Sequence, residues 1–248
     1  MTVWTERRLA NRDLNLAERE LGKTVLHSRP PEVCLQLTEN VDGTLPGHTM
    51  SEPLFDRVAD LFATAETVDL WARGDGPILR RLPRFVAQAL ESGCGIRLFC
   101  GPGMLDSALL RRLVQAEAVV TLTVDPDDAL GTEAVMQDLK TLADGDVRLE
   151  LVARPAAMSE LTAVAKHAAG LGVHTRLSPP DTALSALNTA IRDGETPADP
   201  WRRLHVDYRG EVGVCDIAVV GNATTSTLLE LWNDRKYREL REKWKGNR

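Results

Sequence analysis

Residues 67–100 read TVDLWARGDGPILRRLPRFVAQALESGCGIRLFC and hold the pattern that decides the fold. Two short runs rich in branched and aromatic apolar residues, Thr67–Trp71 and Gly95–Cys100, are typical of buried strands. Between them, apolar residues recur three and four positions apart, at Leu82, Phe85, Val86 and Leu90. That spacing predicts an amphipathic helix, and Gly93 follows it as a left-handed cap. The stretch therefore predicts a strand, a helix and a second strand.

The same alternation continues on both sides of this stretch. Further strand-like runs lie at Val33–Thr38, Ala118–Val124, Val147–Ala153 and Val173–Ser178. Helical segments are predicted around Leu54–Phe62, Leu105–Leu113, Thr132–Ala143, Ser159–Ala169 and Thr182–Arg192. Ser159 and Asp181 suit N-cap positions, and Gly170 suits a left-handed helix end. Six strand–helix repeats predict a parallel sheet with helices outside, whose functional residues follow the strands' carboxyl ends.

The composition of the 248 residues excludes several functional classes. A hydrophobic fraction of 43% with 27% charged residues argues against wholesale disorder. The formal net charge of −6 leads us to expect no nucleic acid partner. No apolar run reaches the roughly 20 residues that cross a bilayer, and the start lacks the apolar stretch of a signal peptide. We therefore expect no membrane partner and a cytoplasmic location.

A different pattern begins after the connector GETPADP at residues 194–200. Alternation through Leu204, Val206 and Tyr208, followed by a turn at residues 209–210, predicts a hairpin that continues to Ile217. A closing helix is predicted over about Ser226–Lys245. Its basic residues are Arg235, Lys236, Arg238, Arg241, Lys243 and Lys245, with Arg248 beyond it. They form either a solvated helix end favoured by the helix dipole or a patch for a partner or acidic ligand.

The order of these segments resembles that of the radical S-adenosylmethionine (radical-SAM) family, in its SPASM/twitch subgroup. The stretches that carry the likeness are LAERELGKTVLHSRPP, VCLQLTEN, VDLWARGDGPILRRLPRFV, IRLFCGPGMLDSALLRRL, TLTVDPDD and RLELVARPAAMSELTAVAKHAAGLGVHTRL. The tail HVDYRGEVGVCDIAVVGNATTSTLLELWNDRKYRELREK is similar to the subgroup's C-terminal extension. The resemblance implies an α/β fold, a partial (β/α)6 TIM-like barrel at residues 1–195, followed by a degenerate SPASM/twitch-like hairpin and helix at residues 196–248.

The resemblance also implies where a cofactor binds, and there the sequence departs from the family. The loop after the family's first strand carries C-x3-C-x2-C, whose thiolates hold a [4Fe–4S] cluster. The corresponding positions in this chain are Val41, Leu45 and His48, and the tail keeps only Cys215. Aliphatic side chains do not bind iron. We therefore expect no [4Fe–4S] cluster, no cleavage of S-adenosylmethionine and no cofactor at all.

Polar residues and glycines gather at the predicted carboxyl edge of the strands. The ligand-binding candidates are Arg73, Gly74, Gly76, Thr123, Arg154 and Arg176. The catalytic candidates are Asp75, Asp125 and His174. Arginines at this edge suit the clamping of a carboxylate or phosphate, and pairing with Asp75 and Asp125 is the alternative. The glycines serve either a tight turn or a close backbone approach to a ligand. His48 is either a solvated loop residue or a ligand to a small molecule or a single metal ion.

Two functions of different classes follow from these expectations. The first is a cluster-less pseudoenzyme in peptide modification or natural-product biosynthesis, which partners an intact radical-SAM enzyme or presents a peptide or small-molecule substrate. The second is a non-radical enzyme that uses the polar barrel mouth on a small anionic metabolite. A third hypothesis keeps S-adenosylmethionine as a bound but uncleaved ligand. The sequence leaves the substrate, the pathway and the oligomeric state open.

Overall fold

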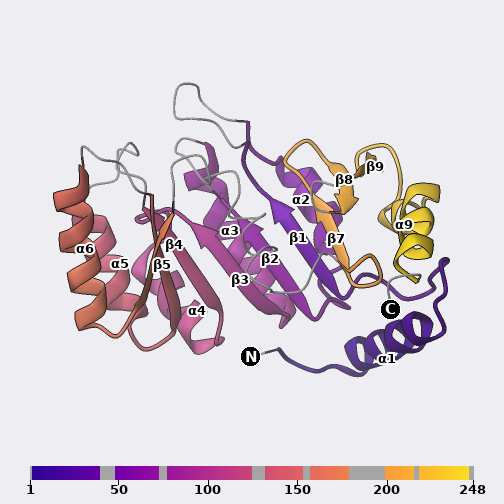
Figure 1. Cartoon of the computed structure of the whole chain (residues 1–248), viewed down its shortest axis with the longest axis horizontal. Helices are drawn as coiled ribbons and strands as arrows, with labels where there is room; N and C mark the ends of the chain where they lie inside the picture. Colours follow the sequence, from indigo (N-terminus) through magenta and orange to yellow (C-terminus); the bar gives the residue numbers. More distant parts are fainter. Residues whose placement is uncertain are drawn as a thin grey trace.

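One curved sheet organises the molecule (Figure 1). A computed structural model describes residues 2–39, 48–72, 77–124, 132–152, 157–178, 199–214 and 218–245. The strands are β1 (Glu32–Gln36), β2 (Thr67–Trp71), β3 (Gly95–Cys100), β4 (Val119–Val124), β5 (Asp146–Val152), β6 (His174–Ser178), β7 (Arg203–Val206), β8 (Glu211–Val214) and β9 (Ala218–Asn222). They lie in the order β6-β5-β4-β3-β2-β1-β7-β8-β9. The first seven run parallel, and β8 and β9 add antiparallel strands beyond β7.

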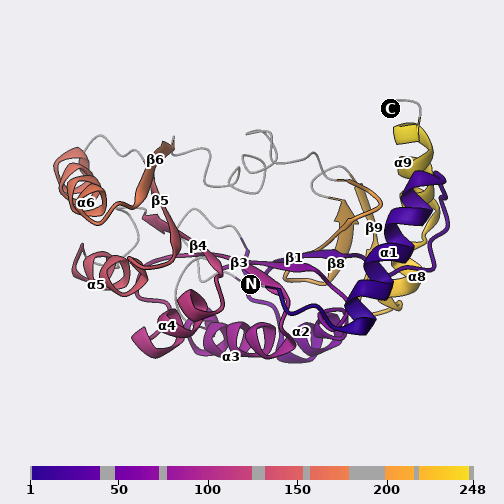
Figure 2. The same ribbon diagram turned by 90° about the horizontal axis from the view of Figure 1, so that it is seen from below.

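Helices cover the convex face and one end of the sheet. The helices are α1 (Glu6–Glu20), α2 (Glu52–Ala59), α3 (Pro77–Ser92), α4 (Ser107–Gln115), α5 (Thr132–Leu142), α6 (Met158–Gly170), α8 (Leu228–Trp232) and α9 (Arg235–Lys245). Figure 2 shows α2 to α6 along the outside of the curve and α1 beside α8 and α9 at the β7–β9 end. The sheet does not close on itself, so the expected α/β fold with a partial (β/α)6 barrel is confirmed.

The core lies between the convex face and the helices because apolar residues alternate along each strand. In β3, Ile96, Leu98 and Cys100 are buried on this side, whereas Arg97 and Phe99 face the concave side. Helix α3 buries Leu82, Phe85 and Val86 on the stripe that its spacing predicts. A continuous apolar core of this kind fixes which strand residues remain on the concave side.

The structure corrects several element boundaries. The predicted closing helix is two helices, because Asn233 ends α8 and its Oδ1 accepts a hydrogen bond from the amide of Leu26 at 2.8 Å. The left-handed residue after α6 is Gly172 rather than Gly170, which is still helical. Ser159 is not the N-cap of α6, because the helix already begins at Met158. Gly93 is confirmed as left-handed, with φ of 72°.

Some expectations fall in residues 179–198, which the structure does not describe. They are the helix predicted at Thr182–Arg192, its cap Asp181 and the proposed domain boundary between residues 195 and 196. Helix α1 has no counterpart in the sequence-based expectation. Within the described residues, no helix combines the length and the apolar content that a membrane span requires.

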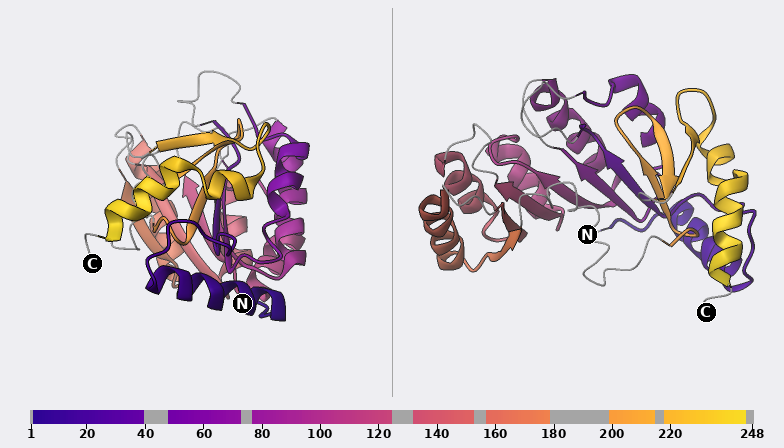
Figure 3. Two further views of the ribbon diagram at one scale, coloured as in Figure 1. Left: turned by 90° about the vertical axis from the view of Figure 1, so that its right-hand side faces the viewer. Right: turned by 45° about the horizontal axis from the view of Figure 1, so that its top comes forward.

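Buried Arg241 fastens the C-terminal helices to the barrel. Its guanidinium donates to the carbonyl oxygens of Pro200 at 2.9 Å, Thr24 at 2.7 Å and Trp232 at 2.8 Å. It also lies over the rings of Trp232 and Tyr237. Burial lowers the pKa of Arg241 to about 10, which leaves the group charged at neutral pH. Figure 3 shows α9 and α1 together at this end of the sheet.

Candidate functional site

The strand register arranges the concave face in rows of side chains that run across the sheet. The amino-end rows hold Glu32, Asp69 and Arg97, with Arg203 beside them on β7. The middle row consists of Gln36, Trp71, Phe99, Thr121, Arg148 and His174. The next row toward the carboxyl ends contains Thr123, Glu150 and Arg176. This face is therefore polar and aromatic, in contrast to the aliphatic convex face.

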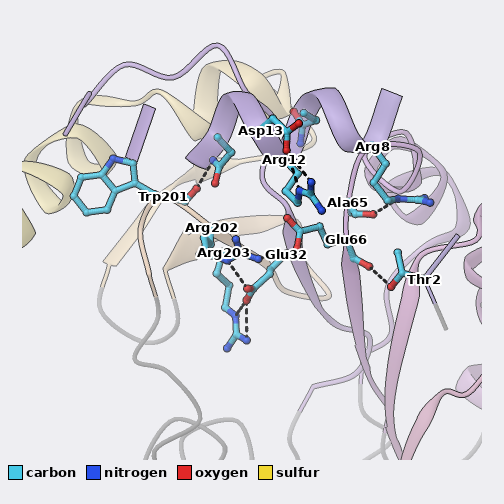
Figure 4. A network of polar contacts seen from close by, with 12 residues as sticks. Thr2, Arg8, Arg12, Asp13, Glu32, Ala65, Glu66, Trp201, Arg202 and Arg203 are labelled. Atoms are coloured by element: carbon cyan, nitrogen blue, oxygen red, sulfur yellow. Dashed lines mark hydrogen bonds and ion pairs between the residues drawn. The ribbon is translucent and has the colours of Figure 1, made fainter. Parts of the chain in front are cut away.

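The amino-end rows form an ionic floor, which we define as Glu32, Asp69, Arg97 and Arg203. Arg97 binds Asp69 bidentately, with both N–O distances at 2.7 Å. Arg203 lies 3.2 Å from Glu32 and 3.9 Å from Asp69. Figure 4 shows Arg202 and Arg203 converging on Glu32. Residues at this end of a barrel usually serve stability, and the closed ion pairing supports that role here.

The charge balance of the floor follows from the surroundings of Glu32. Burial raises the pKa of Glu32, but the hydrogen bond from Arg202 and the charges of Arg203 and Arg202 outweigh it, so the net pKa is lowered. Arg202 also reaches Glu66 at 3.0 Å. Arg203 on β7 and Arg202 just before it both bind Glu32 on β1, and Arg202 also binds Glu66 just before β2. These ion pairs hold β7 beside β1.

An aromatic pair lies above the floor. Trp71 and Phe99 are register neighbours on β2 and β3, and their rings stack at 3.6 Å with an interplanar angle of 7°. Both side chains are partly exposed. The indole Nε1 of Trp71 is buried and has no hydrogen-bond partner among the described residues. A buried donor without a partner is rare in proteins.

Next to this pair, the β4–β6 side of the face is hydrophilic. Thr123 is buried and its hydroxyl donates to Glu150 at 3.4 Å. Arg176 is the register neighbour of Glu150 on β6, and its side chain is exposed. The concave face therefore offers stacking, hydroxyl, carboxylate and guanidinium groups within a few strands of one another.

A second polar group, the Glu39 cluster (Glu39, His48, Tyr208 and Arg209), lies where β1 and β7 end. Glu39 Oε2 is 2.7 Å from His48 Nδ1, and Glu39 Oε1 accepts from the Tyr208 hydroxyl at 2.7 Å. Arg209 donates to the same Oε1 at 3.0 Å. Since the His48 side chain is 81% exposed and its Nδ1 is engaged, Nε2 is the ring nitrogen left for a ligand.

The backbone fixes this cluster. The amide of Glu39 donates to the carbonyl of His48 at 2.9 Å, and Thr38 and Thr49 form an antiparallel bridge. The chain before residue 40 and after residue 47 therefore runs side by side. Hydrogen bonds from His48 and Tyr208 lower the pKa of Glu39 to about 2. Burial and the hydrogen bond to Glu39 raise the pKa of Tyr208 to about 12.

We expect the Glu39 carboxyl to titrate with a midpoint near 2, measured by carboxyl carbon NMR shifts. Its folded pKa lies below the unfolded value of about 4.3, so Glu39 stabilises the fold above about pH 4.3. That contribution is lost as the pH falls through about 2. Tyr208→Phe removes one hydrogen-bond donor and is expected to raise the midpoint by roughly one unit. A wild-type midpoint near 4.3 would show that the cluster does not form.

The structure places only part of the predicted site. Thr123 lies in the row of Glu150 and Arg176, and His48 belongs to the Glu39 cluster. His174 was expected at the carboxyl edge but is the first residue of β6, exposed and in register with Arg148. The remaining candidates lie outside the described residues: Val41, Leu45, Arg73, Gly74, Asp75, Gly76, Asp125 and Arg154.

Sequence reasoning missed the partners that complete these groups. Glu39 follows the first strand directly, which is a signal available in the sequence. Tyr208 and Arg209 were assigned only to a hairpin, because nothing local indicates that β7 pairs in parallel with β1. Trp71, Phe99 and Glu150 were counted as parts of strands, although their alternation places them on the concave side.

The described cysteines are buried. Cys94 and Cys100 belong to the apolar core, whereas Cys34 is the register neighbour of Asp69 on the concave side. Burial raises the pKa of Cys94 and of Cys100. Their thiols are therefore poorly disposed to ionise and ligate a metal. Within the ranges that the structure describes, no three histidine, cysteine, aspartate or glutamate side chains gather as a metal site. Cys215 lies outside those ranges.

Comparison with solved structures shows what the fold is similar to. Streptococcus suis SuiB bound to its precursor peptide SuiA matches with a TM-score of 0.59 and 10% identity, over 93% of this chain and 70% of that one. SuiB bound to S-adenosylmethionine matches with a TM-score of 0.56 and 9% identity, over 93% and 69%. Native anSMEcpe with bound AdoMet and Kp18Cys peptide matches with a TM-score of 0.52 and 12% identity, over 85% and 82%. The chain thus shares the fold of SuiB and anSMEcpe.

Sequence comparison adds one finding about the tail. Residues 198–248 match the SPASM family model, described as an iron-sulfur cluster-binding domain. No curated protein matches the chain significantly. The tail assigned from its hairpin and closing helix is therefore similar to a SPASM domain.

The expectation that the chain takes no cofactor is contradicted by these findings. The matched family model is that of a cluster-binding domain, and two similar structures hold S-adenosylmethionine, so the comparisons point toward an iron–sulfur cluster and S-adenosylmethionine. The metal-binding side chains of this chain do not by themselves form a complete site for such a cluster. Clusters are held mainly by several cysteine thiolates, and residues 198–248 contain one cysteine.

Proposed function

We propose that this chain is a peptide-binding component of a radical-SAM-type peptide-modifying system and works beside a catalytic enzyme. The concave face of the half-barrel receives the peptide. The single observation that carries the proposal is the stacked pair Trp71–Phe99, partly exposed on an open sheet beside a hydrophilic row. In the similar structures, SuiB holds a precursor peptide and anSMEcpe holds a short peptide.

The chemistry of the face suits a peptide better than a small ion. Stacked aromatic rings offer a flat apolar surface for a peptide side chain. Glu150 and Thr123 supply acceptor and hydroxyl groups on the same side. Such alternation of apolar and polar groups is what an extended chain with alternating side chains requires.

The positions of the cysteines support the proposal that this chain binds the peptide while a partner enzyme carries out the catalysis. The three described thiols are buried, and the ligand positions that the resemblance implies hold no cysteine. A cluster bound to the partner enzyme, together with S-adenosylmethionine, would supply the radical chemistry. Within this chain the residues of the concave face bind and orient the peptide for that chemistry.

Co-expression tests this function directly. The tagged chain is produced with the short peptides encoded beside its gene, and co-purified peptides are identified by mass spectrometry. We expect one peptide to bind, and Trp71→Ala to weaken it about tenfold, because one aromatic contact is worth about 1.5 kcal/mol. Trp4→Ala is the matched control, since Trp4 is exposed on the N-terminal segment. Melting curves confirm that both variants fold.

Two results would contradict the proposal. One is a peptide that binds wild-type protein and Trp71→Ala equally, because the concave face would then not be the binding surface. The other is full reconstitution of a cluster on this chain alone, counted as iron and sulfide under anaerobic conditions. That result would indicate that this chain is itself a radical enzyme and does not depend on a catalytic partner.

A non-radical enzyme is the second candidate, and the Glu39 cluster favours it. A carboxylate that binds Nδ1 of a histidine orients the ring and fixes its tautomer, so that Nε2 can accept a proton. Arg209, which is 59% exposed in its side chain, lies in the same cluster and suits an anionic metabolite. Turnover of such a metabolite that is lost in Glu39→Gln and His48→Gln would favour this candidate over the first.

A further inference from the structure

A groove lies on the surface between α9 and the connection that leads from α1 to β1. Its volume is about 530 Å3. Its lining residues are Thr24, Arg235, Arg238, Glu239, Glu242 and Lys243. Helix α9 lies at the β7–β9 end of the sheet (Figure 3). The residues that line the groove include none from the concave face or from the Glu39 cluster.

The groove carries a surplus of positive charge on an acidic protein. The groove is lined by three cations, Arg235, Arg238 and Lys243, and by two carboxylates, Glu239 and Glu242, whereas the whole chain has a net charge of −6. Both carboxylates are already paired along the helix: Glu239 with Arg235 at 3.5 Å and Glu242 with Lys245 at 3.0 Å. The charge that is not neutralised therefore lies on the other cations.

Arg238 and Lys243 are the cations that the fold leaves uncommitted. Both line the groove and are exposed. The structure describes no ion pair or side-chain hydrogen bond from either group to another described residue. Lys236, by contrast, donates to the carbonyl of Val219 on β9 at 2.6 Å. Arg238 and Lys243 are five residues apart on α9, or about 1.4 helical turns, so they lie on either side of Glu239 and Glu242. A guanidinium and an ammonium placed in this way suit two separate carboxylates of a ligand.

Exposed aliphatic side chains lie near the groove on the segment that contributes Thr24. They are Leu21, which is 72% exposed, and Val25, which is 48% exposed. The connection lies directly on α9, because the Thr24 carbonyl accepts from Arg241, and a Cβ on Gly22 would come within 3.0 Å of Lys245. Exposed aliphatic side chains beside unpaired cations form a surface that is both apolar and basic.

From these observations we infer that the groove binds an acidic peptide segment that also carries aliphatic side chains. Carboxylates of the segment bind Arg238 and Lys243, and its aliphatic side chains pack on Leu21 and Val25. The inference rests on the proposed function in one respect, since the acidic segment is assigned to the peptide partner. The peptide partner then binds at two separate places, the groove and the concave face. Binding at both raises its overall affinity without new contacts at the concave face.

A peptide fits this surface better than an anionic membrane does. Glu239 and Glu242 lie between the groove cations, and Glu20 is exposed at the end of α1. A bilayer presents a continuous negative surface and would meet these carboxylates at the same depth. A peptide segment can place its own charges opposite Arg238 and Lys243 alone.

Fluorescence anisotropy of the full chain tests the inference with a labelled peptide of four Asp-Glu-Leu repeats. We expect the double variant Arg238→Glu/Lys243→Glu to raise Kd at least tenfold. The matched control is Arg111→Glu/Arg112→Glu, the same charge change on exposed residues of α4, and we expect Kd to stay within about twofold. Raising the salt from about 50 to about 500 mM should weaken wild-type binding several-fold.

The exposed aliphatic residues near the groove are tested with a second pair of variants. Leu21→Asn is expected to weaken the Asp-Glu-Leu peptide about threefold, whereas Leu229→Asn, at an exposed leucine of α8, leaves Kd unchanged. A counterpart peptide of Asn-Gln-Leu repeats should bind at least tenfold more weakly. Equal binding of the two peptides, or equal effects of the two charge reversals, would overturn the inference. So would Arg238-dependent sedimentation with phosphatidylserine vesicles at matching affinity, because that result would identify a membrane site.

The same assay separates this inference from the proposed function. Trp71→Ala should leave binding of the Asp-Glu-Leu peptide unchanged, because the groove does not include the concave face. Groove binding together with no peptide on the concave face would refute the proposed function and retain the groove. Peptide binding on the concave face that is unaffected by Arg238→Glu/Lys243→Glu would refute the groove and retain the proposed function.

Discussion

Replacing Arg8 by methionine is expected to lower the free energy of unfolding by about 4 kcal/mol or more. The Arg8 side chain has no exposed surface and lies on α1. Its guanidinium donates to five carbonyl oxygens, those of Val3, Phe62, Ala65, Ser92 and Gly93. Each buried carbonyl that loses its donor costs about 1–3 kcal/mol, and water can reach only some of them after the substitution. Urea denaturation measures the loss.

Arg7→Met is the matched control for this prediction. Arg7 precedes Arg8 on the same helix and is exposed, so we expect a change of less than about 0.5 kcal/mol. Equal effects of the two variants would show that α1 is not fastened to the ends of α2 and α3 as described. The same carbonyls explain why α1 is part of the fold: Arg8 joins it to the turns that precede β2 and β3.

Helix α1 shows why a search for apolar periodicity misses part of a fold. Its buried residues are Arg8, Asn11, Asn15 and Glu18, which recur three and four positions apart and are all polar. Asn15 donates to the carbonyl of Trp201 at 2.7 Å, and Glu18 accepts from the amides of His27 and Ser28. A helix docked by hydrogen bonds leaves no apolar stripe in the sequence.

The barrel strands, by contrast, are predictable because their apolar residues alternate against one core. The predicted bounds of Thr67–Trp71 and Gly95–Cys100 are those of β2 and β3. The stop at Gly93 is also confirmed, since only a residue without Cβ adopts its positive φ easily. The closing helix was predicted as one because its apolar spacing continues past Asn233, whose side chain instead binds the backbone of Leu26.

The candidate site was less predictable because pairing between distant strands creates it. Tyr208 meets Glu39 only because β7 lies parallel to β1, and the two residues are 169 positions apart. The Trp71–Phe99 pair likewise depends on strand register rather than on a motif. The cofactor expectation failed for another reason. It rested on cysteine positions alone, whereas the family match to residues 198–248 extends over the whole segment.

The second large effect is expected in the ionic floor. Asp69→Val should cost about 3–5 kcal/mol of unfolding free energy, because it leaves the guanidinium of Arg97 without its bidentate partner inside the half-barrel. Asp69 is 5% exposed, and Arg97 is its register neighbour on β3. Burying an unpaired charge is the costly part, since the pair itself contributes little relative to apolar side chains of similar size.

The double variant Asp69→Val/Arg97→Leu is therefore expected to recover most of that loss and to lie within about 1.5 kcal/mol of wild type. A double-mutant cycle from urea denaturation gives the coupling between the two residues. Arg203 keeps its contact with Glu32 at 3.2 Å in the double variant, so the remaining charges stay paired. If the ionic floor serves only stability, the double variant is also expected to bind peptide as wild type does. Restored stability with lost binding would instead place Asp69 and Arg97 in the binding surface, and the peptide would then reach the amino ends of the strands.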